Sequence, residues 1–252
     1  MINDNYVLDK KIGSGAFGTV YKGYHRITGD NYAIKVGEST QIDYEARIMK
    51  LLNGHKNIPR LKWCGIIQSH KCIVTDLYSL SLGEINRNKL NIKSYMKQML
   101  STLEFIHSKG LVHRDIKPDN FMIKSSDVER IYLIDYGMAR QFGKYDSPRA
   151  LIGSKMYASI NVHKGSPYGR RDDLESIVYT LIFLMCNKLP WSELKCINDS
   201  EMTEKLIKAK TQISNIEHKN MELMKVVNLH KYAQGLGMRE TPSYSYINNK
   251  LI

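Results

Sequence analysis

Apolar and polar positions alternate over short runs in the first third of the chain, which is typical of strands. Runs rich in β-branched and aromatic residues at 6–8, 19–21 and 32–36 predict three strands, with a turn at 28–30 between the last two. Apolar residues at helical spacing predict a helix over 42–52 that ends at Asn53 and Gly54. Strand-like runs return at 61–68 and 72–77.

Beyond residue 80 the apolar period changes from that of strands to that of helices. One apolar face predicts a helix over 92–106, closed by Lys109 and Gly110. A second predicted helix, 174–185, follows Asp172 and Asp173 and is apolar nearly all round, so we expect it in a core. Weaker patterns predict helices at 202–210 and 221–233. The chain is therefore expected to be α+β, with a small strand-rich part and a larger helical part divided near residue 78.

Composition narrows the classes of protein that fit this pattern. The 252 residues suffice for one large domain or two modest lobes. A net charge of +12 favours polyanionic partners such as nucleic acid, nucleotides and acidic or phosphorylated proteins. The four cysteines lack C-x-x-C spacing, which argues against zinc and disulfides and predicts reduced, mostly buried thiols. No signal peptide or transmembrane segment is evident, so we expect an intracellular protein of the cytoplasm, the nucleus or both.

A glycine-rich stretch and a lysine near the start are candidate phosphate-binding groups. "IGSGAFGTV", residues 12–20, is either a plain turn or a loop whose glycines let backbone N–H groups approach phosphates. Because residues 19–21 continue as a strand, the loop closes a hairpin. Lys35 follows inside "YAIKV", and it is either a solvent-facing strand residue or an ammonium held by Glu45 to fix the α and β phosphates of ATP.

"LVHRDIKPDNFMI", residues 111–123, places six polar side chains between two apolar runs. It is either a solvated turn between two short strands or the reaction centre of a phosphoryl transfer. In the second interpretation, Asp115 accepts the substrate hydroxyl proton, Lys117 meets the γ-phosphate and Asn120 binds a metal through its amide oxygen. "IYLIDYG" supplies Asp135 as the metal carboxylate, and one Asp with one Asn suffices for Mg²⁺.

Together and in this order, the glycine loop, Lys35, Glu45, "HRDIKPDN" and "DYG" resemble the eukaryotic protein kinase family. The resemblance implies a bilobal kinase fold, with a small antiparallel β-rich N-lobe and a larger mainly helical C-lobe, and ATP and Mg²⁺ as cofactors. It implies one kinase domain over 1–252, with lobes 1–78 and 79–252. It implies catalytic roles for Lys35, Glu45, Asp115 and Lys117, metal binding by Asn120 and Asp135, and ATP binding by Ile12, Gly13, Ser14, Gly15, Ala16, Phe17, Gly18, Val20, Ala33, Lys35, Thr75, Asp76 and Leu77.

Further motifs resemble the casein kinase 1 family. "YASINVH" has Ser-Ile-Asn where most kinases carry Ala-Pro-Glu, and "HRDIKPDNF", "RRDDLES", "LPW" and "PSYSYI" fit the same family. The resemblance implies transfer to serine or threonine of acidic or already phosphorylated proteins, without phosphorylation of the activation loop. Asp173 resembles the residue that anchors the catalytic-loop backbone in this family, although from the residues alone a helix N-cap is an equal alternative.

Some positions depart from the casein kinase 1 pattern. Tyr136 replaces the usual Phe and brings a hydroxyl that needs a partner. Met156 occupies the place of an arginine that holds a primed phosphate, which argues against strong dependence on priming. Thr75 is smaller than the methionine common in the family and predicts a more open back of the adenine pocket. Four cations could still form a substrate anion site: Arg114, Arg140, Arg149 and Lys155. Arg140 and Arg149 fit solvated loop charges equally well.

The sequence leaves two rival functions open. A pseudokinase scaffold would bind ATP or partners without catalysis, although the catalytic positions are intact. A basic binder of nucleic acid or membrane surfaces would use the +12 charge, but no base-stacking motif or amphipathic basic helix supports it. We therefore expect protein substrates and no specific nucleic acid. The chain ends at Ile252, from which we expect a constitutively active kinase without a regulatory tail. We also expect a monomer.

Overall fold

The computed structural model describes residues 5–15, 17–85, 90–143, 153–213 and 220–251. The chain forms two compact units. The first contains Met1–Leu80 and Met122–Gly137, and the second contains Ser81–Phe121 and Met138–Ile252. The first unit thus includes a stretch that comes after much of the second in the sequence.

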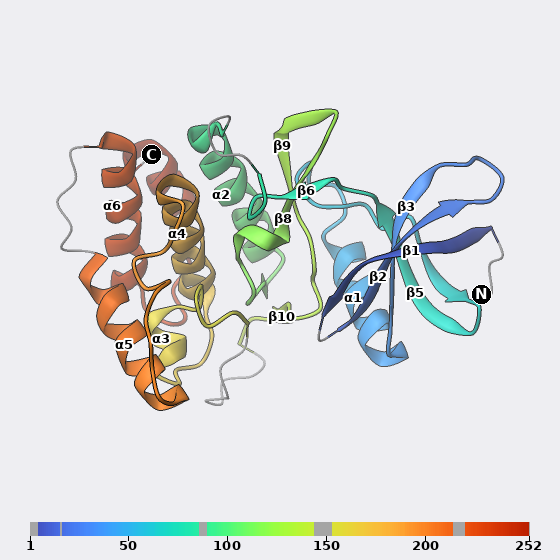
Figure 1. The fold of residues 1–252 in the computed structure, drawn as a ribbon. Coiled ribbons are helices and arrows are strands. Elements are labelled where there is room, and N and C mark those ends of the chain that lie inside the picture. Colours follow the sequence, from blue (N-terminus) through green and yellow to red (C-terminus); the bar gives the residue numbers. More distant parts are fainter. Residues whose placement is uncertain (1–4, 16, 86–89, 144–152, 214–219, 252) are drawn as a thin grey trace. The chain divides into compact units, whose positions relative to one another are not determined.

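The first unit is built on a five-stranded antiparallel sheet in the order β1-β2-β3-β5-β4, with helix α1 following β3 (Figure 1). The first two strands are longer than predicted and pair down to Gly15 and Gly18, because most of the glycine-rich stretch is itself extended. The bounds of these elements are β1 Tyr6–Gly15, β2 Gly18–His25, β3 Asn31–Gly37, α1 Ser39–Leu51, β4 Trp63–Ile67 and β5 His70–Asp76.

The register of this sheet sorts side chains between its faces, since neighbours along a strand point to opposite sides. Ile34 lies opposite Val74, and both are buried in a hydrophobic cluster. The residues on either side of Ile34, Ala33 and Lys35, therefore point to the other face. Lys35 lies opposite Val20 there.

The second unit is mainly helical. Its longest helices are α2 and α4, and the predicted helices are all present (Figure 1). Short strands β7 and β10 of this unit pair with each other. Strands β6, β8 and β9 form a separate sheet in that order, of which β9 and most of β8 belong to the first unit. The remaining bounds are β6 Leu80–Ser81, α2 Ile92–Ser108, β7 Leu111–Val112, a 3₁₀ turn Pro118–Asn120, β8 Phe121–Lys124, β9 Asp127–Leu133, β10 Arg140–Gln141, α3 Ile160–His163, α4 Arg170–Cys186, α5 Asp199–Gln212, α6 Met221–Gly235, α7 Tyr244–Tyr246 and a π-turn Ile247–Leu251.

Helix α4 is buried along most of its length, as its apolar pattern predicted, but it begins earlier than expected. Gly169 is its N-cap, and Asp172 lies in its first turn, where its Oδ2 accepts a hydrogen bond from Gly169 N. The acidic pair predicted to precede the helix thus belongs to it, because carboxylates are favoured near the positive end of a helix.

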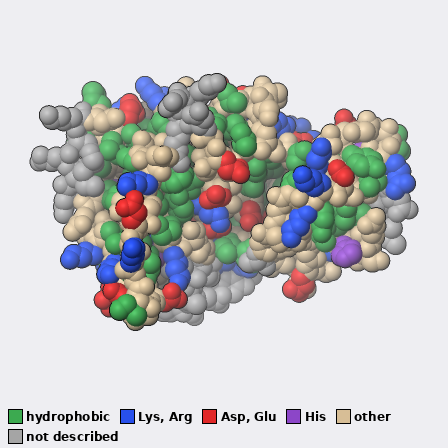
Figure 2. All heavy atoms as spheres, viewed as in Figure 1, with side chains coloured by type: hydrophobic (Ala, Val, Ile, Leu, Met, Phe, Trp, Pro, Cys, Tyr) green, Lys and Arg blue, Asp and Glu red, His purple; other side chains and the backbone are tan. Residues whose placement is uncertain are grey.

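Two expectations drawn from composition can be compared with the described residues. All four cysteines are free, as predicted, but only Cys72 is buried and Cys186 is exposed at the end of α4, so the expectation of mostly buried thiols was wrong. Among the described residues, no helix is long and apolar enough to cross a membrane. On the face shown in Figure 2, basic and acidic side chains are interspersed.

Candidate active site

In the glycine-rich hairpin, packing requires a glycine at position 18 but not at positions 13 and 15. Gly18 has a left-handed φ of +134°, and a Cβ there would lie 2.2 Å from the carbonyl oxygen of Val36. A Cβ at Gly13 would meet only Val20 at 3.9 Å, and one at Gly15 would meet nothing within 4 Å. The fold leaves these two backbones open to a ligand, which fits a phosphate cradle. Ile12 and Ser14 are exposed beside them, and Ala16 lies outside the described residues.

Lys35 is held between two carboxylates of the first unit. Its Nζ lies 2.7 Å from Glu45 Oε2 and 2.9 Å from Asp135 Oδ1. The Lys35 side chain is 14 % exposed and that of Glu45 4 %, so Lys35 is not the solvent-facing strand residue of the alternative interpretation. Burial alone would lower the pKa of Lys35, but the attraction of Glu45 and Asp135 outweighs burial and raises its pKa. The lysine therefore stays charged, as a phosphate ligand must.

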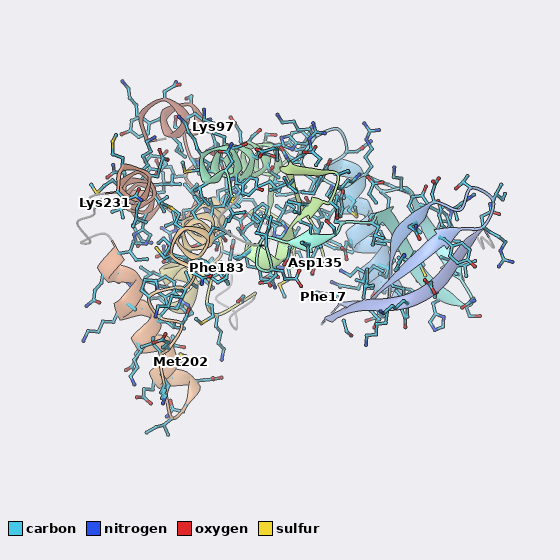
Figure 3. The ribbon with its side chains drawn as sticks, turned by 45° about the horizontal axis from the view of Figure 1, so that its top comes forward. Phe17, Lys97, Asp135, Phe183, Met202 and Lys231 are labelled. Carbon is cyan, nitrogen blue, oxygen red and sulfur yellow. The ribbon has the colours of Figure 1, made fainter. Side chains whose placement is uncertain are left out.

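Asp135 lies in a tight turn that fixes its carboxylate. Its φ of +62° is left-handed, a conformation that a non-glycine residue adopts at some cost. Its Oδ1 also accepts the N–H of Gly137 at 3.3 Å. The Tyr136 hydroxyl is buried and donates to the Leu133 carbonyl at 2.8 Å, which supplies the partner that this departure from Phe requires. Phe17 packs on Gly137, and Figure 3 labels Phe17 and Asp135.

The predicted adenine-binding residues lie along the same sheet. Ala33 is paired with Thr75, and both are partly buried. The Thr75 hydroxyl donates to the Asp76 carbonyl at 3.3 Å, while the Asp76 carboxylate pairs with Lys62 at 3.0 Å. Leu77 follows directly after the end of β5. Thr75 is thus a short side chain opposite Ala33, itself small, and the open back of the pocket stays a prediction.

We expect Thr75→Met to weaken bulky ATP-site inhibitors by about tenfold or more, because the longer side chain occupies space that their bulky groups would enter. Inhibition curves at matched ATP saturation measure the effect. Thr75→Val, which has nearly the same shape, serves as the control and should retain the parent potency. Equal potency on Thr75→Met and the parent would show that the pocket is not open at this point.

In the second unit, Asp115 is surrounded by hydrogen-bond donors. Its Oδ2 lies 2.7 Å from Lys117 Nζ and 3.0 Å from Asn120 Nδ2, and its Oδ1 accepts Ser154 N at 3.1 Å. Asn120 Nδ2 also donates to the Asp115 carbonyl at 2.8 Å, so its amide oxygen takes no part in these bonds. Asp115 and Asn120 are 7 % and 6 % exposed, which excludes a solvated turn.

The backbone before Asp115 is fixed by Asp173 of α4. The carboxylate of Asp173 accepts the N–H groups of His113 and Arg114 at 2.7 and 2.8 Å. Arg114 has a left-handed φ of +72°, so this anchor holds a strained conformation. His113 is fully buried, in line with a packing role. Asp173 itself lies inside the helix that Gly169 caps, and the alternative of a helix N-cap was wrong.

The structure extends this anchor to residues that sequence reasoning missed. His107 Nε2 lies 3.1 Å from Asp173 Oδ2, and the Tyr244 hydroxyl lies 2.7 Å from His107 Nδ1. Burial lowers the pKa of His107, so its ring is neutral, whereas hydrogen bonds lower the pKa of Asp173 despite its burial. A carboxylate only accepts, so Nε2 carries the proton and Nδ1 accepts from Tyr244. "PSYSYI" was the only sequence signal for this contact.

We expect Tyr244→Phe to lower kcat several-fold with little change in KM for ATP, because a buried acceptor on His107 loses its donor and the anchor loosens. Tyr246→Phe is the matched control in the same helix, since Tyr246 is 47 % exposed. Amide hydrogen exchange at His113 and Arg114 separates positioning from general stability. Exchange there should accelerate in Tyr244→Phe alone, and unchanged exchange with unchanged kcat would contradict the role.

Three of the candidate anion-site residues lie in the described part of the chain, and each of these has a partner of its own. Arg114 Nε donates to the Met138 carbonyl and Arg140 Nη1 to the Ala139 carbonyl, both at 2.7 Å. Lys155 pairs with Asp199 at 2.8 Å, where the lysine is 46 % exposed. Arg149 lies outside the described residues. Lys155 therefore shares its charge with a carboxylate, which makes it a weaker substitute for the missing arginine.

A metal would have to be shared between protein and nucleotide. In the described residues, no group of three or more His, Cys, Asp or Glu side chains is arranged to hold a metal ion. Mg²⁺ keeps several water and phosphate oxygens, so a single carboxylate such as that of Asp135 can serve it without such a cluster.

The first unit is an antiparallel sheet with a glycine hairpin and a charged lysine, and the second is a helical unit with a fixed Asp, Lys and Asn. These are the parts of the bilobal α+β fold of protein kinases. Comparison with known families supports this class, because the sequence model of the protein kinase domain matches residues 6–240. The chain belongs to the protein kinase family. Membership implies ATP as phosphoryl donor, proteins as substrates and, typically, a divalent metal.

Proposed function

We propose that this protein is a serine/threonine kinase of the casein kinase 1 type, with Mg²⁺ as its metal and acidic proteins as substrates. Its proposed site is the set of residues predicted from the sequence, with Asp115 as the base for the substrate hydroxyl. Bound ATP would supply the phosphoryl group, and Mg²⁺ would offset the negative charge of its phosphates. We also propose a monomer of the cytoplasm, the nucleus or both, with one domain over 1–252 and lobes 1–78 and 79–252.

The observation that carries the proposal is the cluster of Lys117 and Asn120 on the carboxylate of Asp115. Phosphoryl transfer needs a placed nucleophile and neutralised charge more than covalent help. Asp115 can orient a hydroxyl and take its proton, and Lys117, 2.7 Å away, brings a positive charge to the same point. Asn120 restricts the carboxylate to one orientation.

The casein kinase 1 motifs also support the proposal, because their polar residues have buried partners. The Ser159 hydroxyl donates to Asp172 Oδ1 at 2.5 Å, and the N–H of Ile160 donates to Glu175 Oε1 at 2.8 Å. The motifs "SIN" and "RRDDLES" are therefore joined by hydrogen bonds at the start of α3. Met156 and the pairing of Lys155 with Asp199 favour acidic substrates over a strict need for priming.

A peptide library tests the proposal. We expect transfer to Ser and Thr but not Tyr acceptors, with acidic peptides preferred over neutral ones and priming phosphates raising kcat/KM by less than about tenfold. Because the sequence has no base-stacking motif and no amphipathic basic helix, we also expect no preference for nucleic acid. Tyrosine as the main acceptor, or strong salt-dependent binding to random RNA without phosphotransfer, would contradict it.

A further inference from the structure

A buried lysine outside the proposed site holds the segment of chain that adjoins Asp115. Lys210 lies on α5, beside α3 (Figure 1), and its side chain is fully buried. Its Nζ lies 2.5 Å from the Ala158 carbonyl, 3.2 Å from the Lys155 carbonyl and 2.9 Å from His163 Nε2. An ammonium has three N–H donors, and the two carbonyls accept from it. His163 Nε2 also lies 3.0 Å from the Lys155 carbonyl, so it accepts from Lys210 in one tautomer and donates to that carbonyl in the other.

The same segment is fixed at further points along its length. Trp191 Nε1 donates to the Met156 carbonyl at 3.0 Å, and Ser154 N donates to Asp115 Oδ1 at 3.1 Å. A Cβ at Gly153 would lie 2.5 Å from the Arg114 carbonyl, so the chain approaches the catalytic loop closely there. Residues 154–158 therefore run from Asp115 to the donors of Lys210 and Trp191.

A lysine is a costly choice for this position. Burying a charge costs free energy unless strong hydrogen bonds offset the lost water. Here the offset comes from backbone carbonyls that would themselves be unpaired in the core, and from the rings of Tyr179 and Trp191 at 4.8 and 5.2 Å from Nζ. A methionine or leucine would fill the same space without the charge cost. It would remove the Lys210 donor from the Ala158 carbonyl and leave the Lys155 carbonyl with His163 Nε2, 3.0 Å away, as its neighbour.

We propose that Lys210 is a positioning residue that fixes residues 154–158 beside Asp115 and thereby sets the affinity for the protein substrate. This rests on the proposed function, because Asp115 must be the group that receives the substrate hydroxyl. A substrate polypeptide that delivers its hydroxyl to Asp115 has to pass over residues 154–158, because Ser154 N contacts Asp115 Oδ1. Lys210 holds this same segment.

The ionisation of Lys210 provides a second means of testing the proposal. Burial lowers its pKa to about 7, with Glu175 of α4 opposing the shift. The other titratable groups in its surroundings are Tyr179 of α4, His163 of α3, His230 of α6 and Lys155 of the held segment. Above this pKa the amine is neutral and its hydrogen bonds lose their charge assistance, so substrate affinity should fall as the pH rises through neutrality.

Lys210→Met is the test variant, and Lys208→Met on the same helix is the matched control because Lys208 is exposed. With an unphosphorylated acidic peptide, we expect Lys210→Met to raise the peptide KM about tenfold while KM for ATP stays at the parent value. Lys208→Met should behave as the parent. An unchanged peptide KM in Lys210→Met, or an equal rise in both KM values, would overturn the proposal.

The pH profile covers the case in which Lys210→Met does not fold. In the parent, the peptide KM should rise several-fold from about pH 6 to about pH 8 while KM for ATP stays flat, and a flat peptide KM would overturn the proposal. A parent that phosphorylates no peptide would refute the proposed function itself. An active parent with identical Lys210 and Lys208 variants would refute only the role of Lys210.

Discussion

Replacing Asp115 with asparagine is expected to lower kcat by a factor of roughly 10² to 10⁴, the usual contribution of a positioned general base. The amide cannot take the hydroxyl proton. Its NH₂ group would also face donors, because Lys117 and Asn120 both donate to Oδ2 and Ser154 N donates to Oδ1. KM for ATP should change little, since the expected nucleotide ligands of the first unit are untouched. Steady-state kinetics with a Ser peptide measures both quantities.

Asp119→Asn is the matched control, because it makes the same substitution four residues later at an exposed position. It should leave kcat within about twofold of the parent. If Asp115→Asn retained the parent kcat, Asp115 would not be the base. If the parent itself bound ATP without transferring phosphate, the scaffold interpretation would replace the kinase one.

The local parts of this architecture could be predicted from the sequence because local patterns encode them. Alternation and helical spacing located the strands of the first sheet and helices such as α2 and α6. The motif order identified Lys35, Glu45 and Asp135, and in the fold Lys35 Nζ lies 2.7 Å from the Glu45 carboxylate and 2.9 Å from that of Asp135. Motif residues were predictable because their chemistry limits which side chains can serve.

Contacts between distant segments could not be predicted in the same way. In the sequence, Lys210 ends a weak polar helix and resembles a solvated charge, yet packing of α5 against the chain near Ala158 buries it completely. Tyr244 meets His107 across 137 residues of sequence. Such partners depend on how helices pack against one another, and spacing within one helix carries no information about its neighbours.

Replacing Lys35 with methionine is expected to lower kcat/KM for ATP by roughly 10² or more, because a preorganised charge beside the phosphates is lost. The change also leaves Glu45, 3 % exposed, without its countercharge, at a cost in folding stability of up to about 3 kcal/mol. The loss of activity could therefore reflect the fold alone, and kinetics must be measured together with thermal unfolding. Lys10→Met, on an exposed part of β1, is the control for the substitution itself.

The double variant Lys35→Met/Glu45→Gln separates the two effects. Removing both charges takes away the unpaired buried carboxylate, so the melting temperature should return most of the way to that of the parent. Activity should stay at the low level of Lys35→Met, because the neutral pair still offers no positive charge to the nucleotide. Recovery of kcat/KM together with stability would mean that Lys35 matters only for folding.

Since Asp135 Oδ1 also loses its 2.9 Å partner in both variants, a parallel Asp135→Asn variant should be equally inactive without the loss of stability that unpairing Glu45 causes.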